Sequence, residues 1–329
     1  SGQFKEVSAV VSNLALRIDT NVDFNRDLEE QIMVALDDAG ILPDDVIVAQ
    51  SSGSLEVEIK VGNCGGRRKC MKDILPIVNK NTGKKFVKMD NICNIKVDGS
   101  CSIKFKEAYK YQIAGGVARA YKSRDKVSGD NYSFMELKNG KYMMALSDGM
   151  GTGAKAAIES NTTISLLEKF LCAGFDKDIA IRTINSLILL KSNEESYATV
   201  DMTVINQYNG EVEFVKVGAV STFVKSGNKV EIIRTSTLPV GILSSVEADI
   251  ENRKLKSGDL IVMVTDGVLD SNKDELNKEK WLSNMIEDIE TRNPQAMADT
   301  ILINCLDYTS GVPNDDMTVM VAKIWETIN

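Results

Sequence analysis

The chain has 329 residues, enough for one large domain or two of ordinary size. Its 43% hydrophobic content is normal for a globular protein with a sizeable core. The net charge is −8, with the whole acidic excess after residue 115. This charge argues against a nucleic-acid partner, because neutralising phosphates requires a basic face.

Two further features bear on membrane insertion and secretion. No apolar run approaches the roughly 18–20 residues needed to cross a bilayer, which predicts that this stretch is soluble. The chain begins Ser-Gly, and no charged segment leads into an apolar one, so we expect no signal peptide. We expect this sequence to be a piece of a longer protein.

The absence of histidine restricts the possible chemistry most strongly. It excludes Ser-His-Asp and Cys-His catalysis and histidine-ligated zinc. Cys64 and Cys70, and Cys93 and Cys101, are spaced more widely than the roughly two to four intervening residues usual at structural zinc sites. We therefore expect reduced thiols, with zinc as the alternative. Any catalysis must use carboxylates, Lys, Ser/Thr, Cys or metal-bound water.

The first part of the chain, residues 1–103, has the pattern of a small α+β unit. Apolar residues at helical spacing alternate there with short runs of period two. Gly40 and Pro43 end the second helix, and Asp98-Gly99 marks a turn between the last two strands. The predicted elements are helices at 7–18 and 28–39, a strand at 55–61, a short helix at 71–78, and strands at 86–97 and 100–108.

From about residue 109 the pattern changes to long β runs interrupted by two pairs of helices. Asn139-Gly140 and Asn209-Gly210 are dipeptides that type I′ hairpins prefer, and Ser226–Asn228 predicts a third turn. Such short loops can join only antiparallel strands. We therefore predict two antiparallel sheets flanked by helix pairs. The strands are expected at 109–122, 131–138, 141–147, 198–208, 211–217, 221–234, 258–264 and 314–325, and the helices at 164–171, 176–188, 282–289 and 293–305.

The segment SDGMGTG, residues 147–153, follows an apolar strand and precedes a helix. Gly149, Gly151 and Ala154 fit the dinucleotide fingerprint G-x-G-x-x-A. However, the preceding strand pairs through a hairpin, and the acidic residue that should follow a second strand is missing. A P-loop is excluded because no Gly-Lys-Ser/Thr follows. Nucleotide binding is thus the weaker interpretation of this loop.

A metal site is the stronger interpretation, because four β runs each carry an aspartate at one end. Each alone is ordinary turn chemistry. Together they provide the oxygen ligands that magnesium and manganese prefer. A glycine after the aspartate also lets its backbone carbonyl approach an ion. The four residues are Asp130, Asp148, Asp266 and Asp316.

The motifs SGDN, SDGMGTG, TDG and NDDMT, in this order, resemble the PPM family of metal-dependent serine/threonine protein phosphatases. The likeness runs from about residue 109 to the end and is greatest to a bacterial sporulation branch. It implies an αββα sandwich at 104–329. It also implies that residues 1–103 form a regulatory or oligomerisation unit that switches the enzyme.

The resemblance also implies a two-metal site and its reaction. Asp148 would bridge two Mn²⁺ or Mg²⁺ ions, and the Gly149 carbonyl would bind the second ion. Asp266 and Asp316 would bind the first ion, and Asp130 would hold a metal or its water. Asp315 would be a neighbour. Water activated by the ions would attack phosphorus in line.

The sequence departs from animal members of that family at two points. Met150 stands where they carry a histidine just after the bridging aspartate. They also hold the phosphate with an arginine, and the sequence does not indicate which arginine would do so in this chain. Arg119 and Lys122 belong to a basic run that is expected to be a solvated face. The basic run also contains Arg124 and Lys126.

The resemblance further implies partners and location. The substrate would be a phosphorylated anti-sigma factor antagonist, and a tubulin-like cell-division protein and a second copy of the chain would bind. The fragment would act at the cytoplasmic face, anchored by an upstream membrane segment. The helix face of Ile181, Ile184 and Ile188 could rest on the sandwich alone or carry the regulatory contact. The alternative function is a catalytically silent scaffold of the same fold.

Overall fold

The computed structural model describes residues 23–51, 54–64, 67–89, 99–122, 127–151, 153–191, 197–234, 237–242 and 248–327. The chain divides into two compact units between Tyr109 and Lys110. The expected boundary between residues 103 and 104 lies inside the last strand of the first unit. The helix expected at 7–18, and Asp98 of the expected turn, lie outside the described residues.

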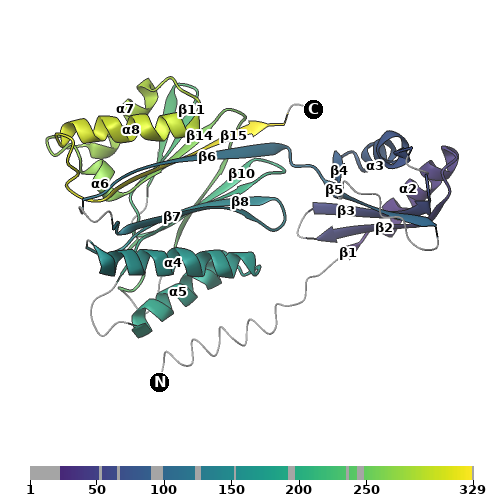
Figure 1. The fold of residues 1–329 in the computed structure, drawn as a ribbon, viewed down its shortest axis with the longest axis horizontal. Helices are drawn as coiled ribbons and strands as arrows, with labels where there is room; N and C mark the ends of the chain where they lie inside the picture. The colour runs from purple at the N-terminus through teal and green to yellow at the C-terminus, as the bar shows by residue number, and fades with distance from the viewer. Residues whose placement is uncertain are drawn as a thin grey trace. The chain divides into compact units, whose positions relative to one another are not determined.

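The first unit is an antiparallel sheet covered on one face by helices (Figure 1). The strand order is β1-β2-β3-β5-β4. Strand β2 was not predicted, because the polar residues around Pro43 hide its short alternation of Val46 and Val48. The elements are β1 (Asp23–Phe24), α2 (Arg26–Asp38), β2 (Pro43–Ser51), β3 (Ser54–Gly62), the π-helix η1 (Cys70–Ile74), α3 (Leu75–Thr82), β4 (Phe86–Lys88) and β5 (Ser100–Glu107).

The second unit contains two five-stranded antiparallel sheets, in the orders β13-β10-β9-β8-β7 and β12-β11-β14-β15-β6. Strand β13 and the short helix α6 were not predicted. The strands are β6 (Tyr111–Ala120), β7 (Asp130–Leu137), β8 (Lys141–Asp148), β9 (Val200–Asn206), β10 (Glu211–Val217), β11 (Thr222–Ser226), β12 (Lys229–Ile233), β13 (Asp249–Lys254), β14 (Leu260–Val264) and β15 (Met317–Glu326). The helices are α4 (Ala154–Cys172), α5 (Lys177–Lys191), α6 (Asp266–Leu269), α7 (Lys278–Asp288) and α8 (Pro294–Tyr308).

The predicted hairpins are present, although one turn differs in type. Asn139 and Gly140 have φ of 61° and 64°, the two left-handed residues that a type I′ turn requires. Between β9 and β10 the connection is residues 207–210, and Gly210 alone adopts a positive φ, 76°. The longer loop keeps the antiparallel pairing of the two strands.

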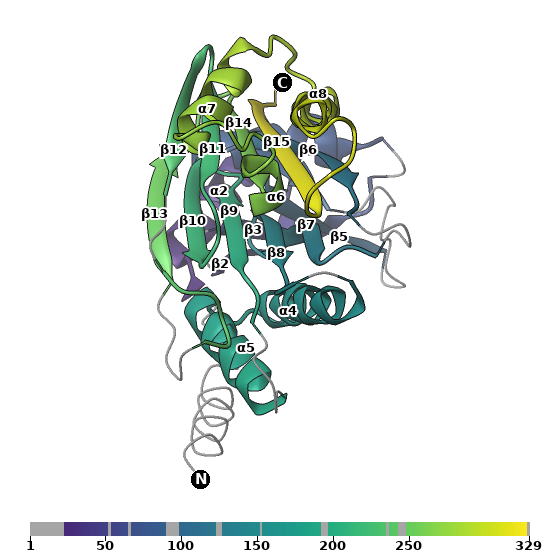
Figure 2. The same cartoon turned by 90° about the vertical axis from the view of Figure 1, so that its left-hand side faces the viewer.

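The second unit has four layers, and its hydrophobic side chains form three cores between them (Figures 1 and 2). Helices α4 and α5 cover the β7–β10 sheet, and α7 and α8 cover the other sheet. The predicted αββα sandwich is therefore confirmed. Ile181, Ile184 and Ile188 are buried in the core beneath α4 and α5, so the sandwich itself occupies that face.

The described helices include none that combines the length and apolar character needed to cross a membrane.

Candidate active site

The four predicted aspartates meet at one edge of the sandwich, contributed by both sheets. Asp130 begins β7 and lies directly opposite Asp148, the last residue of β8. Asp266 is the first residue of α6, just after β14, and Asp316 immediately precedes β15. Strand pairing and the short β14–α6 connection thus bring together residues that are far apart in the sequence.

The alternation of side chains along the strands places the aspartates on the faces that point into the space between the sheets. In β7 and β8, Asp130 and Asp148 share a face with Tyr132 and Leu146, which belong to the core between the sheets. Thr265 lies two residues beyond Met263 of that core, and Thr318 two before Met320. The aspartates are therefore the polar end of an otherwise apolar layer.

Asp130 is 1% exposed and joins the two sheets. Its Oδ2 accepts hydrogen bonds from the hydroxyls of Thr265, at 3.0 Å, and Thr318, at 2.7 Å. The Thr318 backbone N–H in turn donates to the Thr265 hydroxyl at 2.9 Å. Two of the three elements that supply the other aspartates are thereby fixed to β7.

The loop before β9 holds Asp148 and Gly149 in place. Thr199 donates its N–H to the Asp148 carbonyl and accepts the Asp148 N–H on its hydroxyl, at 2.8 and 2.9 Å. Gly149 forms an isolated bridge with Ala198. A Cβ on Gly149 would lie 2.1 Å from the carbonyl oxygen of Ala156, so only glycine allows α4 this close to the site.

Asp316 is also buried and is held by backbone donors. Its two carboxylate oxygens accept the N–H groups of Lys122, at 2.9 Å, and Gly129, at 2.7 Å. A Cβ on Gly267 would lie 2.2 Å from the Asp316 carbonyl oxygen, which shows how closely the Asp266-Gly267 turn packs on it. The neighbouring Asp315 forms an ion pair with Lys122 at 3.7 Å.

The electrostatics of the site follow from several carboxylates gathered at one edge, where Asp130 and Asp316 are buried, Asp148 is half-buried and Asp266 is exposed. Burial, followed by repulsion from Asp130 and Asp266, raises the pKa of Asp148 to about 9. Burial raises the pKa of Asp130 to about 6, against the effect of the two threonine hydroxyls. Burial and repulsion from Asp315 raise the pKa of Asp266. Such mutual destabilisation of charge marks functional sites, because a cation relieves it.

The aspartates do not form a ready-made metal-binding group. Among the described residues, no three Asp, Glu or Cys side chains form a group placed to bind one metal. Among the described cysteines, Cys70, Cys172 and Cys305 are free thiols. Met150 is 43% exposed beside Gly149.

Arg119 was expected on a solvated basic face and instead lies half-buried against the site. One guanidinium N–H₂ group donates to the Asp130 carbonyl at 2.6 Å, and the guanidinium lies over the rings of Tyr121 and Tyr132. Its Nε is buried and has no partner among the described residues. Arg124 and Lys126 lie outside the described residues.

Sequence reasoning missed the residues that hold the aspartates. Thr265 and Thr318 lie within the motifs TDG and NDDMT. Both are on the strand faces that point toward the other sheet, where Asp130 lies. Their spacing of two residues from the inward-facing Met263 and Met320 could have indicated that they face the site. Nothing local indicated Thr199, because its role depends on the pairing of β8 with β9.

Comparison with known proteins identifies the class of protein to which this fold and site belong. The family profile described as Stage II sporulation protein E (SpoIIE) matches residues 138–325. The solved PP2C phosphatase domain of SpoIIE from Bacillus subtilis, with a fragment of its regulatory domain, is 33% identical at a TM-score of 0.79. That alignment covers 100% of this chain and 96% of the solved one. A serine/threonine phosphatase of S. agalactiae, 16% identical at a TM-score of 0.53 over 66% of this chain and 100% of its own, shares the fold.

The second unit is thus a protein phosphatase domain of the PP2C class. The chain belongs to the stage II sporulation protein E family. It is 37% identical to the Priestia megaterium member and 34% to the Bacillus subtilis member, in each case over 98% of its own length. It spans 55% and 39% of those two proteins, about half or less of each.

Proposed function

We propose that the chain hydrolyses phosphoserine in a protein substrate and that a pair of divalent cations, Mn²⁺ or Mg²⁺, binds at the aspartate edge. The observation that carries this proposal is the meeting of Asp130, Asp148 and Asp266 at one edge of the sandwich, where their pKa values are raised. Carboxylate oxygens are the donors these cations prefer, so the chemistry of these residues fits them. Asp316 and the Gly149 carbonyl complete the proposed ligands.

Bound divalent cations would lower the pKa of a bound water to near neutrality and offset the charge of the phosphoryl group. The chain's own residues have distinct tasks. Thr265 and Thr318 orient the Asp130 carboxylate, and the 197–199 segment fixes the Asp148 backbone. Gly149 lets α4 approach without a side chain intervening. The chain offers no histidine to protonate the leaving group, so water is the proposed acid.

The experiment is hydrolysis of an aryl phosphate by purified chain, with and without manganese. We expect activity only with the metal, and we expect Asp148→Asn and Asp316→Asn each to abolish it while the circular dichroism spectrum is kept. A silent scaffold, the second candidate, would bind manganese and show no turnover. Near-normal kcat in either variant at saturating manganese would remove that residue from the ligand set.

Substrate, partners and regulation are proposed from family membership. The substrate is proposed to be a phosphorylated anti-sigma factor antagonist, with a tubulin-like division protein and a second copy as partners. Full-length protein is proposed to be membrane-anchored upstream, with this part at the cytoplasmic face. Residues 1–103 are proposed to switch the enzyme by shifting α4 and Gly149. Identical manganese titrations for residues 109–329 and the activated longer chain would contradict the switch.

A further inference from the structure

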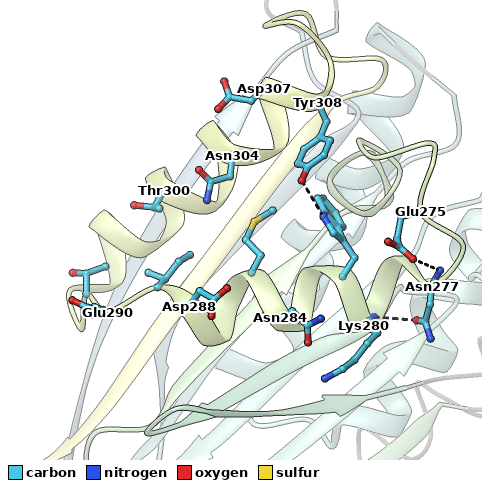
Figure 3. A pocket seen from close by; sticks show the side chains of 14 residues that line it. Glu275, Asn277, Lys280, Asn284, Asp288, Glu290, Thr300, Asn304, Asp307 and Tyr308 are labelled. Carbon is cyan, nitrogen blue, oxygen red and sulfur yellow. Dashed lines mark hydrogen bonds between the residues drawn. The ribbon is translucent and has the colours of Figure 1, made fainter.

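A groove runs between α7 and α8 and is lined by residues of both helices. Their inner faces pack on the β12-β11-β14-β15-β6 sheet. The cavity between them measures about 900 Å³ (Figure 3). None of its lining residues belongs to the proposed catalytic edge. The groove is therefore a surface that the proposed phosphatase reaction does not use.

One end of the groove is apolar and aromatic. The rings of Trp281 and Tyr308 meet edge to face, with centroids 5.2 Å apart, and the indole nitrogen donates to the Tyr308 hydroxyl oxygen at 3.5 Å. Tyr308 is 54% exposed. Met285, which lines the same hollow, is partly buried against the core beneath it. Exposed aromatic and aliphatic groups gathered in one hollow mark protein interaction sites.

The lining also contains acidic side chains. Glu275, Asp288, Glu290 and Asp307 contribute carboxylates, against the single cation Lys280. Asp307 and Glu275 lie toward the aromatic end, and Asp288 and Glu290 lie toward the other (Figure 3). None of the four carboxylates forms an ion pair with another described residue. Glu275 accepts the Asn277 backbone N–H, and Lys225 interacts electrostatically with Asp288, so the charges of Glu290 and Asp307 are the most available to a ligand.

These features together select the chemistry of the occupant. An anionic lipid surface or a nucleic acid would be repelled by the four carboxylates. A cationic side chain can pair with a carboxylate or lie over the indole ring, and an adjacent apolar side chain can fill the aromatic end. Amide and hydroxyl groups of Asn284, Thr300 and Asn304 between the carboxylates can bond a peptide backbone.

We propose that the α7–α8 groove docks a positively charged, amphipathic segment of a protein partner. Lysine or arginine side chains of that segment contact the carboxylates, and its apolar side chains contact Trp281 and Tyr308. This docking is separate from the aspartate edge and does not depend on the proposed phosphatase activity.

The test uses the full chain with Trp325→Phe. Because the sequence holds two tryptophans, this variant leaves Trp281 as the only one. The probe is an acetylated peptide of about twelve residues in which lysine and leucine alternate. We expect it to change the Trp281 fluorescence and to bind more weakly as salt rises. The same peptide with glutamate for lysine, and spermine, which lacks the apolar part, are expected to bind at least tenfold more weakly.

The matched variants are Asp288→Asn with Asp307→Asn in the groove and Asp37→Asn with Asp38→Asn on α2. Both pairs remove the same charge. Exposed ion pairs are weak, so we expect the groove pair to lose about fivefold in affinity and the α2 pair to bind normally. Equal affinity for the lysine and glutamate peptides, or equal losses in both variant pairs, would overturn the proposal. Spermine binding as tightly as the peptide would show a small-cation site instead.

Aryl phosphate hydrolysis provides the separating readout. The groove pair is expected to keep normal kcat and KM for this small substrate, since it leaves the aspartate edge untouched. Loss of peptide binding with normal hydrolysis therefore tests the groove alone. An inactive parent protein would count against the proposed phosphatase function and would leave the fluorescence result valid.

Discussion

Replacing Asp148 with asparagine should stabilise the protein in the absence of metal. The pKa of Asp148 is raised to about 9 by burial and by the neighbouring Asp130 and Asp266. A carboxyl whose pKa is raised on folding contributes stability below its ordinary pKa, and this contribution is lost as pH rises through the raised value. The metal-free protein should therefore lose stability between about pH 4 and pH 9.

The size of the effect follows from the same shift. Each pKa unit corresponds to about 1.4 kcal/mol, so the full elevation represents several kcal/mol of unfavourable charge burial. Asp130 shares this charge and titrates with Asp148. We expect the amide to recover only part of it, about 2 kcal/mol at pH 8, which raises Tm by about 4–8 °C in a domain of this size.

Thermal unfolding in EDTA and in manganese, from pH 5.5 to 9, provides the assay. The wild type should gain about 2.7 kcal/mol at a manganese concentration near 100 Kd, and Asp148→Asn should gain little. Asp274→Asn, at an exposed loop residue, is the control and should follow the wild type. A metal-free Tm for Asp148→Asn at or below that of the wild type throughout this pH range would refute the reasoning.

Three further outcomes are expected. Gly149→Ala should cut aryl phosphate hydrolysis at least tenfold, because its Cβ would lie 2.1 Å from the Ala156 carbonyl oxygen; Gly62→Ala, with open space around it, should leave the rate unchanged. Lys216→Met should lower the free energy of unfolding in urea by about 3–5 kcal/mol, since it leaves Asp201, bonded to it at 2.6 Å, as a buried unpaired charge. Adding Asp201→Leu should recover most of that loss, and no recovery would argue against charge burial as its cause. A folded phosphoserine protein should show a much higher kcat/KM than a short peptide with the same phosphoserine, and equal values would remove the idea of docking.

Local rules determined most of the strands, the positions of the predicted hairpins and the candidate metal ligands. Asn139-Gly140 adopts two left-handed conformations in succession, which few other dipeptides do at low cost, so the β7–β8 hairpin could be predicted from two residues. Glycine after Asp148 and after Asp266 similarly marked turns. These features depend only on residues a few positions apart, which is why the sequence by itself shows them. The motif order added the family, which comparison confirmed.

Tertiary structure decided what joins the two sheets and which side chains support the site. β6 pairs with β15 at the other end of the domain sequence, and no local alternation selects that partner. Thr265 and Thr318 reach Asp130 across 135 and 188 residues, and Arg119 turns inward instead of facing solvent. The groove exists because α7 and α8 rest on one sheet without filling the space between them. Each of these depends on packing between distant segments, which periodicity and turn chemistry do not specify.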